Sequence, residues 1–349
     1  MYIPKRPYLR LFSVTLSLFL TLVPSSLEAA KRDLQDIKII AAEKLTYKDG
    51  FTKLEGAVQM MVDDLLISAP EVNVKDKEKA EFLRDVKVSS EKLNITAKHM
   101  EVDLETGLIK IFSGISEIGV PEKSPDIYRI DADLQTIDYK KGFFKAKSND
   151  KQMTATHKDL TVNADEMQGE FKKETRNASK PDKNKKNTED KTQLDKVVFL
   201  GSVIANKKLS QIKADKLFIF PESKIYRAMH NASFIYIEPG KEFRLKGDFL
   251  NLEELDNSKY VVLASSNSRN GLINFTSPAR KLAGRSKFAR LYLENENATE
   301  VIFTGKCDIR VDNKRIEGEE VYLNNVTKEL LSNLNRPKAI ILQREKLTF

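Results

Sequence analysis

The sequence predicts an all-β protein built from many short antiparallel strands. One eight-residue phrase recurs along the 349 residues, apolar and polar residues alternate within each copy, and turn-forming residues separate the runs. Alternation with a period of two is typical of a strand with one buried face, and Gly, Asn and Asp between such runs favour turns. No long stretch with the period of an amphipathic helix follows the N-terminal segment. We therefore expect repeated strands and no significant helix after that segment.

The N-terminal segment has the features of an export signal. Three basic residues within the first ten precede an apolar run at 11–23, and small residues follow near Ala29. This run is shorter than the roughly 20 residues that cross a bilayer as a helix, so we interpret residues 1–29 as a cleaved signal peptide. The alternative is an uncleaved inner-membrane anchor, because Leu27 makes the cleavage site imperfect.

The net charge of +8 is concentrated outside the predicted strands. Residues 1–29 carry three basic and one acidic residue, and residues 172–191 carry eight basic and four acidic residues, so the remainder is nearly neutral. The charge therefore gives no reason to expect a nucleic-acid partner. Because 172–191 lacks apolar periodicity, we interpret it as a charged linker or long loop between two β-segments, 30–171 and 192–349.

The repeated phrase has an aliphatic residue, a small residue two positions later, and apolar residues five and seven positions later. Its copies, some of them degenerate, begin at Ile40, Ile67, Ile95, Ile130, Val162, Ile212, Leu245 and Ile316. Most separations are about 30 residues, and such a constant period across a whole chain is the signature of a repeat architecture.

Three copies share a longer pattern, in which Gly56, Gly201 and Gly305 each lie eleven residues before the aliphatic position. Repetition of the same offsets three times indicates one local structure. From the alternation in these copies we predict an inward-facing set of apolar residues, which comprises Val58, Ile67, Val72, Val203, Ile212, Leu217, Ile309, Ile316 and Val321.

The sequence offers no recognisable catalytic or metal-binding motif. The single cysteine, Cys307, stands where the other copies have valine, so a small buried side chain is the simplest interpretation, and one cysteine makes no internal disulfide. His99, His157 and His230 lack the spacing of zinc ligands. Nucleophile-elbow and phosphate-binding glycine motifs are also missing. We therefore expect a non-enzymatic protein with no catalytic residues, no metal and no cofactor.

The phrase IxADxLxI, preceded by GxV and repeated behind a signal peptide, resembles the OstA-like β-jellyroll of periplasmic lipopolysaccharide-transport proteins of the LptA and LptC type. The resemblance is clearest in LGSVIANKKLSQIKADKLFIF and spans approximately residues 37–331. The chain is longer than a single-jellyroll bridge protein and contains the charged insert, which favours two jellyroll segments.

The resemblance implies a function for the inward-facing set. Proteins of this family hold lipid acyl chains in an apolar groove and extend their sheets into neighbouring jellyrolls through open strand edges. The nine residues named above would then form a lipid-binding interior, and the partners would be lipopolysaccharide and other jellyroll proteins or further copies of this chain. The chain could be the periplasmic bridge or its membrane-anchored partner. A secreted β-helix adhesin and a structural envelope scaffold are the alternatives.

Overall fold

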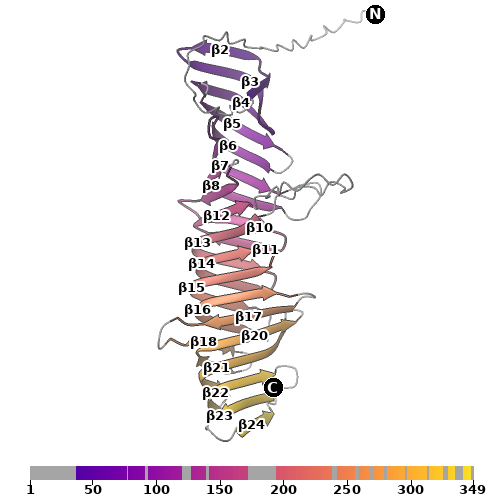
Figure 1. The fold of residues 1–349 in the computed structure, drawn as a ribbon, viewed down its shortest axis with the longest axis vertical. Coiled ribbons are helices and arrows are strands. Elements are labelled where there is room, and N and C mark those ends of the chain that lie inside the picture. Colours follow the sequence, from indigo (N-terminus) through magenta and orange to yellow (C-terminus); the bar gives the residue numbers. More distant parts are fainter. Residues whose placement is uncertain are drawn as a thin grey trace, which may run out of the picture. The chain divides into compact units, whose positions relative to one another are not determined.

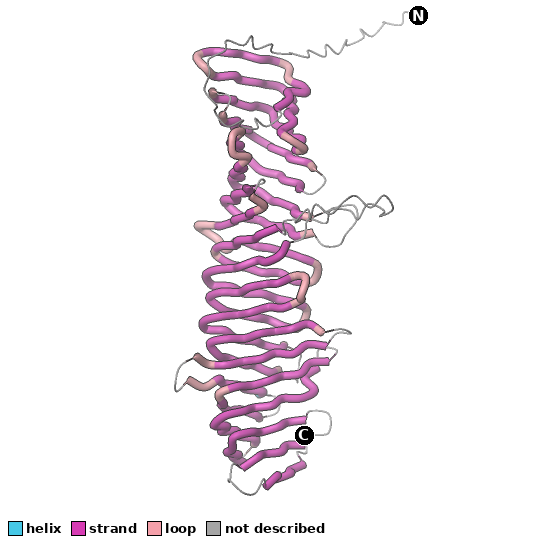
Figure 2. The backbone as a smooth tube through the Cα atoms, viewed as in Figure 1, coloured by secondary structure: helices cyan, strands magenta, loops and turns pink. Residues whose placement is uncertain are grey.

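The fold is all-β, as the sequence predicts. The computed structural model describes residues 37–76, 78–90, 93–119, 127–138, 141–171, 194–237, 242–255, 259–267, 271–278, 281–294, 297–312, 314–324, 329–334 and 341–346. These residues lie in one compact unit, Gln35–Phe349, and they contain strands and turns but no α-helix (Figures 1 and 2). The predicted signal peptide and the charged segment 172–191 lie outside the described residues. The described part of the chain has no helix with the length and apolar character needed to cross a membrane.

The strands follow one another with short turns. The first eight are β1 (Ile37–Ala41), β2 (Lys44–Lys48), β3 (Phe51–Val62), β4 (Leu65–Lys75), β5 (Lys79–Ser89), β6 (Leu93–Asp103), β7 (Leu108–Ile118) and β8 (Tyr128–Asp138). The next eight are β9 (Phe143–Lys147), β10 (Met153–His157), β11 (Leu160–Ala164), β12 (Glu166–Phe171), β13 (Leu194–Lys207), β14 (Ser210–Phe220), β15 (Ile225–Tyr236) and β16 (Phe243–Glu254). The last eight are β17 (Lys259–Ser265), β18 (Ile273–Ser277), β19 (Leu282–Ser286), β20 (Phe288–Glu294), β21 (Asn297–Val311), β22 (Lys314–Asn324), β23 (Glu329–Leu334) and β24 (Ile341–Lys346).

The antiparallel pairings divide into two layers, because a short strand that pairs with a long strand contacts only one half of it. β1 pairs with the second half of β3, whereas β2 pairs with its first half. The same division recurs where β8 pairs with both β9 and β10, and where β16 pairs with both β17 and β18. Layer 1 contains the short strands β1, β10, β11, β18 and β19. Layer 2 contains β2, β9, β12, β17, β20, β23 and β24. The long strands run through both layers.

The repeated phrase marks the place where a strand passes from layer 1 into layer 2. In β4, Ile67 and Ala69 are buried in layer 1, and Val72 is buried in layer 2. The step of three residues between Ala69 and Val72 breaks the period of two, and the ladder to β5 is irregular between Ser68 and Glu71. A β-bulge of this kind bends a strand and re-aims its side chains. The three-residue spacing between the small residue and the next apolar residue of each copy therefore corresponds to one bend of the strand.

The strands that return from layer 2 to layer 1 bend through left-handed residues. In β3 these are Gly56 (φ 78°) and Ala57 (φ 43°), and in β21 they are Gly305 (φ 75°) and Lys306 (φ 53°). The ladder register shifts at the same places, between Glu55 and Val58 and between Thr304 and Cys307. Gly56, Gly201 and Gly305 are thus corner residues, and glycine adopts a left-handed backbone without the steric cost of a side chain.

The two layers face each other across one apolar core. Buried side chains from Leu54 to Leu323 form a single cluster with contributions from both layers. Phe275 of β18 in layer 1 stacks on Phe303, which lies in the layer 2 half of β21, with ring centroids 3.9 Å apart. The corners join the layers along one side, and the hairpin turns form the other side, which we call the mouth.

The N-terminal strands differ from the expected alternation, because every residue of β1 and β2 is exposed. Ile40, Leu45 and Tyr47 occupy apolar positions of the first phrase copy, yet they are 46%, 56% and 70% exposed. Each of these strands pairs with β3 alone, so among the described residues no further strand covers them. The first copy forms the edge of both layers rather than part of the core.

Residues 172–193 connect two strands that pair with each other. β12 pairs with the first part of β13, from Glu166 opposite Leu200 to Phe171 opposite Leu194, and β11 pairs with the second part. The strands before and after the charged segment therefore belong to one continuous ladder in each layer. The division into segments 30–171 and 192–349 stays a prediction.

Candidate binding pocket between the two layers

The residues predicted to face inward lie in the core. Val58, Ile67, Val72, Val203, Ile212, Leu217, Ile309 and Val321 are buried, and Ile316 is partly buried and packs against the same cluster. They come from three strand pairs, β3 with β4, β13 with β14 and β21 with β22. The structure therefore distributes them along the core instead of gathering them at one site. Only Ile212 among them lines the pocket described next.

This pocket lies between the layers near the mouth and has a volume of about 40 Å³. Its walls consist mainly of apolar and aromatic side chains from both layers, namely Leu160, Ala205, Lys207, Lys208, Ser210, Ile212, Tyr226, Leu252, Tyr260 and Leu293. A water molecule needs roughly 10–15 Å³ of such volume, so the pocket has room for about three water-sized groups. A longer chain would have to displace side chains or part the layers.

An ion pair joins the two layers beside this pocket. Lys207 ends β13 in layer 1 and Glu254 ends β16 in layer 2, and Lys207 Nζ donates a hydrogen bond of 2.6 Å to Glu254 Oε2. The two side chains are only 19% and 23% exposed. Lys207 Nζ also lies 5.6 Å from the ring centroids of both Tyr226 and Tyr260, a distance at which cation–π attraction operates.

The ion pair keeps Lys207 charged. Burial by itself would lower the pKa of Lys207, but the hydrogen bond to Glu254 and the nearby charges outweigh it and raise that pKa above its ordinary value. Burial raises the pKa values of Tyr226 and Tyr260, so both rings stay neutral in the physiological range. The result is an apolar pocket with the paired cation of Lys207 at its rim, where Lys208 also forms part of the lining.

Sequence reasoning missed Lys207, Glu254, Tyr226 and Tyr260. The ion-pair partners are 47 residues apart in the chain and belong to different layers. Alternation within a strand shows which side chains face inward, but it does not show which strand ends meet across the mouth. Polar residues next to a turn also have an ordinary explanation as solvated surface. No local signal could have selected this pair.

A second, open pocket of about 410 Å³ is lined by Leu272, Arg285, Lys306, Cys307, Asp308, Arg315, Glu317, Gly318 and Glu319. Asp308 Oδ1 accepts a hydrogen bond of 2.8 Å from Arg315 Nε, and Asp308 Oδ2 lies 3.2 Å from a guanidinium nitrogen of Arg285. These three charged residues of the pocket are therefore paired with one another. Burial raises the pKa of the Cys307 thiol to about 12. The thiol therefore stays protonated and is a poor nucleophile.

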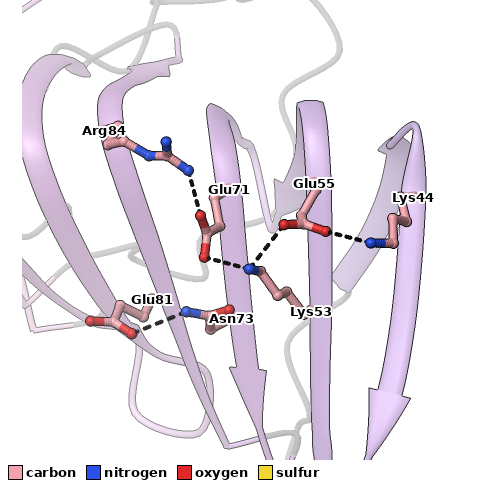
Figure 3. A network of polar contacts seen from close by, with 7 residues as sticks. All are labelled: Lys44, Lys53, Glu55, Glu71, Asn73, Glu81 and Arg84. Carbon is pink, nitrogen blue, oxygen red and sulfur yellow. Dashed lines mark hydrogen bonds and ion pairs between the residues drawn. The ribbon is translucent and has the colours of Figure 1, made fainter.

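A charged network connects the exposed strand β2 to the strands that follow it in layer 2 (Figure 3). Glu55 of β3 lies 3.2 Å from Lys44 of β2 and 2.9 Å from Lys53, and Lys53 in turn lies 3.1 Å from Glu71 of β4. Arg84 of β5 also pairs with Glu71. Hydrogen bonds from Lys53 and Lys44 lower the pKa of Glu55. The network links four neighbouring strands, β2 to β5, on the outer surface.

Among the described residues, no three His, Cys, Asp or Glu side chains gather as a metal site would require.

Comparison with protein-family models gives no match, and the search of curated proteins gives none either.

Proposed function

We propose that this protein is a non-enzymatic periplasmic carrier that holds lipopolysaccharide by its lipid A acyl chains between the two layers and passes it toward the outer membrane. The observation that supports this most is the single apolar cluster from Leu54 to Leu323, to which both layers contribute. Burial of a methylene group is worth about 0.8 kcal/mol, so an apolar interior of this kind can hold acyl chains without any chemistry once the layers part. The sugars and phosphates would stay at the mouth.

Loading would require the layers to move apart. The pocket near Lys207 is only about 40 Å³ in volume, and large side chains such as Phe82, Phe199 and Phe234 fill the core. Because the layers are continuous only at the corners, the mouth is the side that can widen. We therefore expect lipid to enter at the mouth.

The layer edges suit partners of the same architecture. Within the part of the chain that the structure describes, β1 and β2 each pair with β3 and with no other strand. Ile37, Ile39 and Tyr47 in these strands are 41%, 43% and 70% exposed. Unpaired backbone groups beside apolar side chains are a template for sheet extension. At the other end β24 pairs with β23 and with no further strand among the described residues. We infer that further copies of this chain or other jellyroll proteins extend the sheets there.

Two alternatives keep specific support. The filled core also suits a structural envelope scaffold, which would share the fold and bind no lipid. The membrane-anchored form of the carrier differs only in whether residues 1–29 remain, which the mass of the mature protein decides. A β-helix adhesin is less compatible, because the described strand pairings are antiparallel, whereas a β-helix pairs parallel strands.

The test is native mass spectrometry of the full chain purified from a lipopolysaccharide-producing cell. The carrier proposal predicts a co-purifying glycolipid with the mass of lipopolysaccharide or lipid A, and binding of added lipid A after delipidation. A lipid-free protein that also fails to bind added lipid A would favour the scaffold.

A further inference from the structure

Lys207 lines the pocket between the layers and forms an ion pair with Glu254. The pair joins the end of a layer 1 strand to the end of a layer 2 strand, and the apolar walls formed by Ile212, Leu252 and Leu293 lie behind it. A paired charge that is largely removed from water is costly to assemble unless its partner matches it well. The hydrogen bond of 2.6 Å from Lys207 to Glu254 supplies this match at the opening of an otherwise apolar pocket.

We propose that the Lys207–Glu254 pair is a latch, and that the pocket behind it takes the acyl chain of an anionic lipid whose head group replaces Glu254 on Lys207. This inference rests on the proposed function for the class of lipid, but it concerns one site with its own residues. In the closed state Glu254 supplies the negative charge that Lys207 requires. In the bound state the phosphate of the lipid supplies it instead.

The surroundings of Lys207 favour such an exchange. The rings of Tyr226 and Tyr260 lie 5.6 Å from Nζ, so the ammonium group keeps these neighbours when Glu254 leaves. Glu254 is the last residue of β16, and its side chain is already 23% exposed, so its carboxylate can rotate into water. The exchange thus moves one short side chain and leaves the cation in place.

The pocket volume limits what fits before the latch opens. About three water-sized groups fit in 40 Å³, which corresponds to the first few methylenes of a chain. A longer chain would continue between the layers past Ile212 and Leu252, and this requires the two strand ends to separate. Opening the latch and inserting the chain are therefore one event.

The test is calorimetric binding of dodecyl phosphate to the delipidated full chain, with uncharged dodecyl maltoside as the comparison probe. A charge-assisted hydrogen bond is worth enough for the Lys207→Met variant to bind dodecyl phosphate at least about tenfold more weakly, while its affinity for the maltoside is unchanged. Glu254→Gln removes the competing carboxylate, so it should bind dodecyl phosphate several-fold more tightly than the wild type. The matched control is Glu294→Gln, which breaks the exposed Lys259–Glu294 pair and should leave both affinities unchanged.

The two substitutions must have opposite effects. If Glu254→Gln weakens binding as Lys207→Met does, the pair only supports the fold and the latch is overturned. If the wild type binds dodecyl phosphate and dodecyl maltoside equally well, Lys207 does not bind the phosphate, and the latch is overturned. This comparison needs only the wild type, so it holds even if Lys207→Met does not fold. Binding of lipid A without any dependence on Lys207 overturns the latch but not the carrier. Lys207-dependent binding of dodecyl phosphate without binding of lipid A overturns the carrier but not the latch.

Discussion

Ile212 and Lys213 are neighbours in β14 with opposite surroundings. Ile212 is 9% exposed and lines the pocket, whereas Lys213 faces solvent. A carboxylate at position 212 would be buried without a partner, so Ile212→Asp should lower the free energy of unfolding by at least about 3 kcal/mol. Lys213→Asp, the matched control, should change it by less than about 0.5 kcal/mol. Urea unfolding measures both, and similar losses in the two variants would contradict the assigned faces.

Cys307 provides a second residue-level prediction. Burial raises the pKa of its thiol to about 12, so almost no thiolate is present at pH 8, and the thiolate is the reactive form. Iodoacetamide at pH 8 should therefore leave the folded protein unlabelled and should label it fully in urea. Labelling of the folded protein at the rate of a free cysteine would show that this position is open to solvent.

Among the strands, a corner needs a residue that can adopt a left-handed backbone, and it can also leave no room for a side chain at that residue. Gly201 (φ 90°) and Gly142 (φ 66°) both have left-handed backbones. A Cβ at Gly201 would lie 1.9 Å from Asp165 Oδ2, whereas a Cβ at Gly142 would meet nothing closer than 3.5 Å. Asp165 Oδ2 accepts a hydrogen bond from the Ser202 amide, so it is not free to move away.

We therefore expect Gly142→Ala to cost about 1–2 kcal/mol, the usual penalty for a left-handed residue with a side chain. Gly201→Ala should cost clearly more, because it adds a clash at the corner to that penalty. Thermal unfolding of the two variants provides the comparison. Equal losses would mean that the corner adjusts freely and that only the φ angle matters.

Sequence patterns predicted the strands and their buried faces but not the bends. The alternation around Ile67 and Val72 identified both as inward-facing, and both are buried. The step of three residues between Ala69 and Val72 was visible too, but a break in period does not by itself show that the strand crosses into a second layer. In β1 and β2 the pattern predicted buried residues that are exposed. Their exposure depends on which other strands cover them, and their own sequence does not show this.

Over the whole molecule, cleavage within the charged segment 172–191 would show whether the strands on either side of it stay associated. Limited proteolysis should cut this segment first, because it is polar and offers no apolar face. β13 pairs with β11 and with β12, so the two pieces should still elute together in native size-exclusion chromatography and separate only in denaturant. Pieces that separate without denaturant would support two independent β-segments, 30–171 and 192–349.

Lipid bound between the two layers would be within reach of site-specific photo-cross-linking from the core. The cross-linking residue p-benzoylphenylalanine would replace Phe82 or Phe234, which are buried in layer 2 and layer 1 respectively, and Tyr292 on the outward face of β20 as the control. Irradiation in lipopolysaccharide-producing cells should give lipopolysaccharide adducts at the two interior positions and none at position 292. Adducts only at position 292, or none at the interior positions in a folded protein, would contradict lipid binding between the layers.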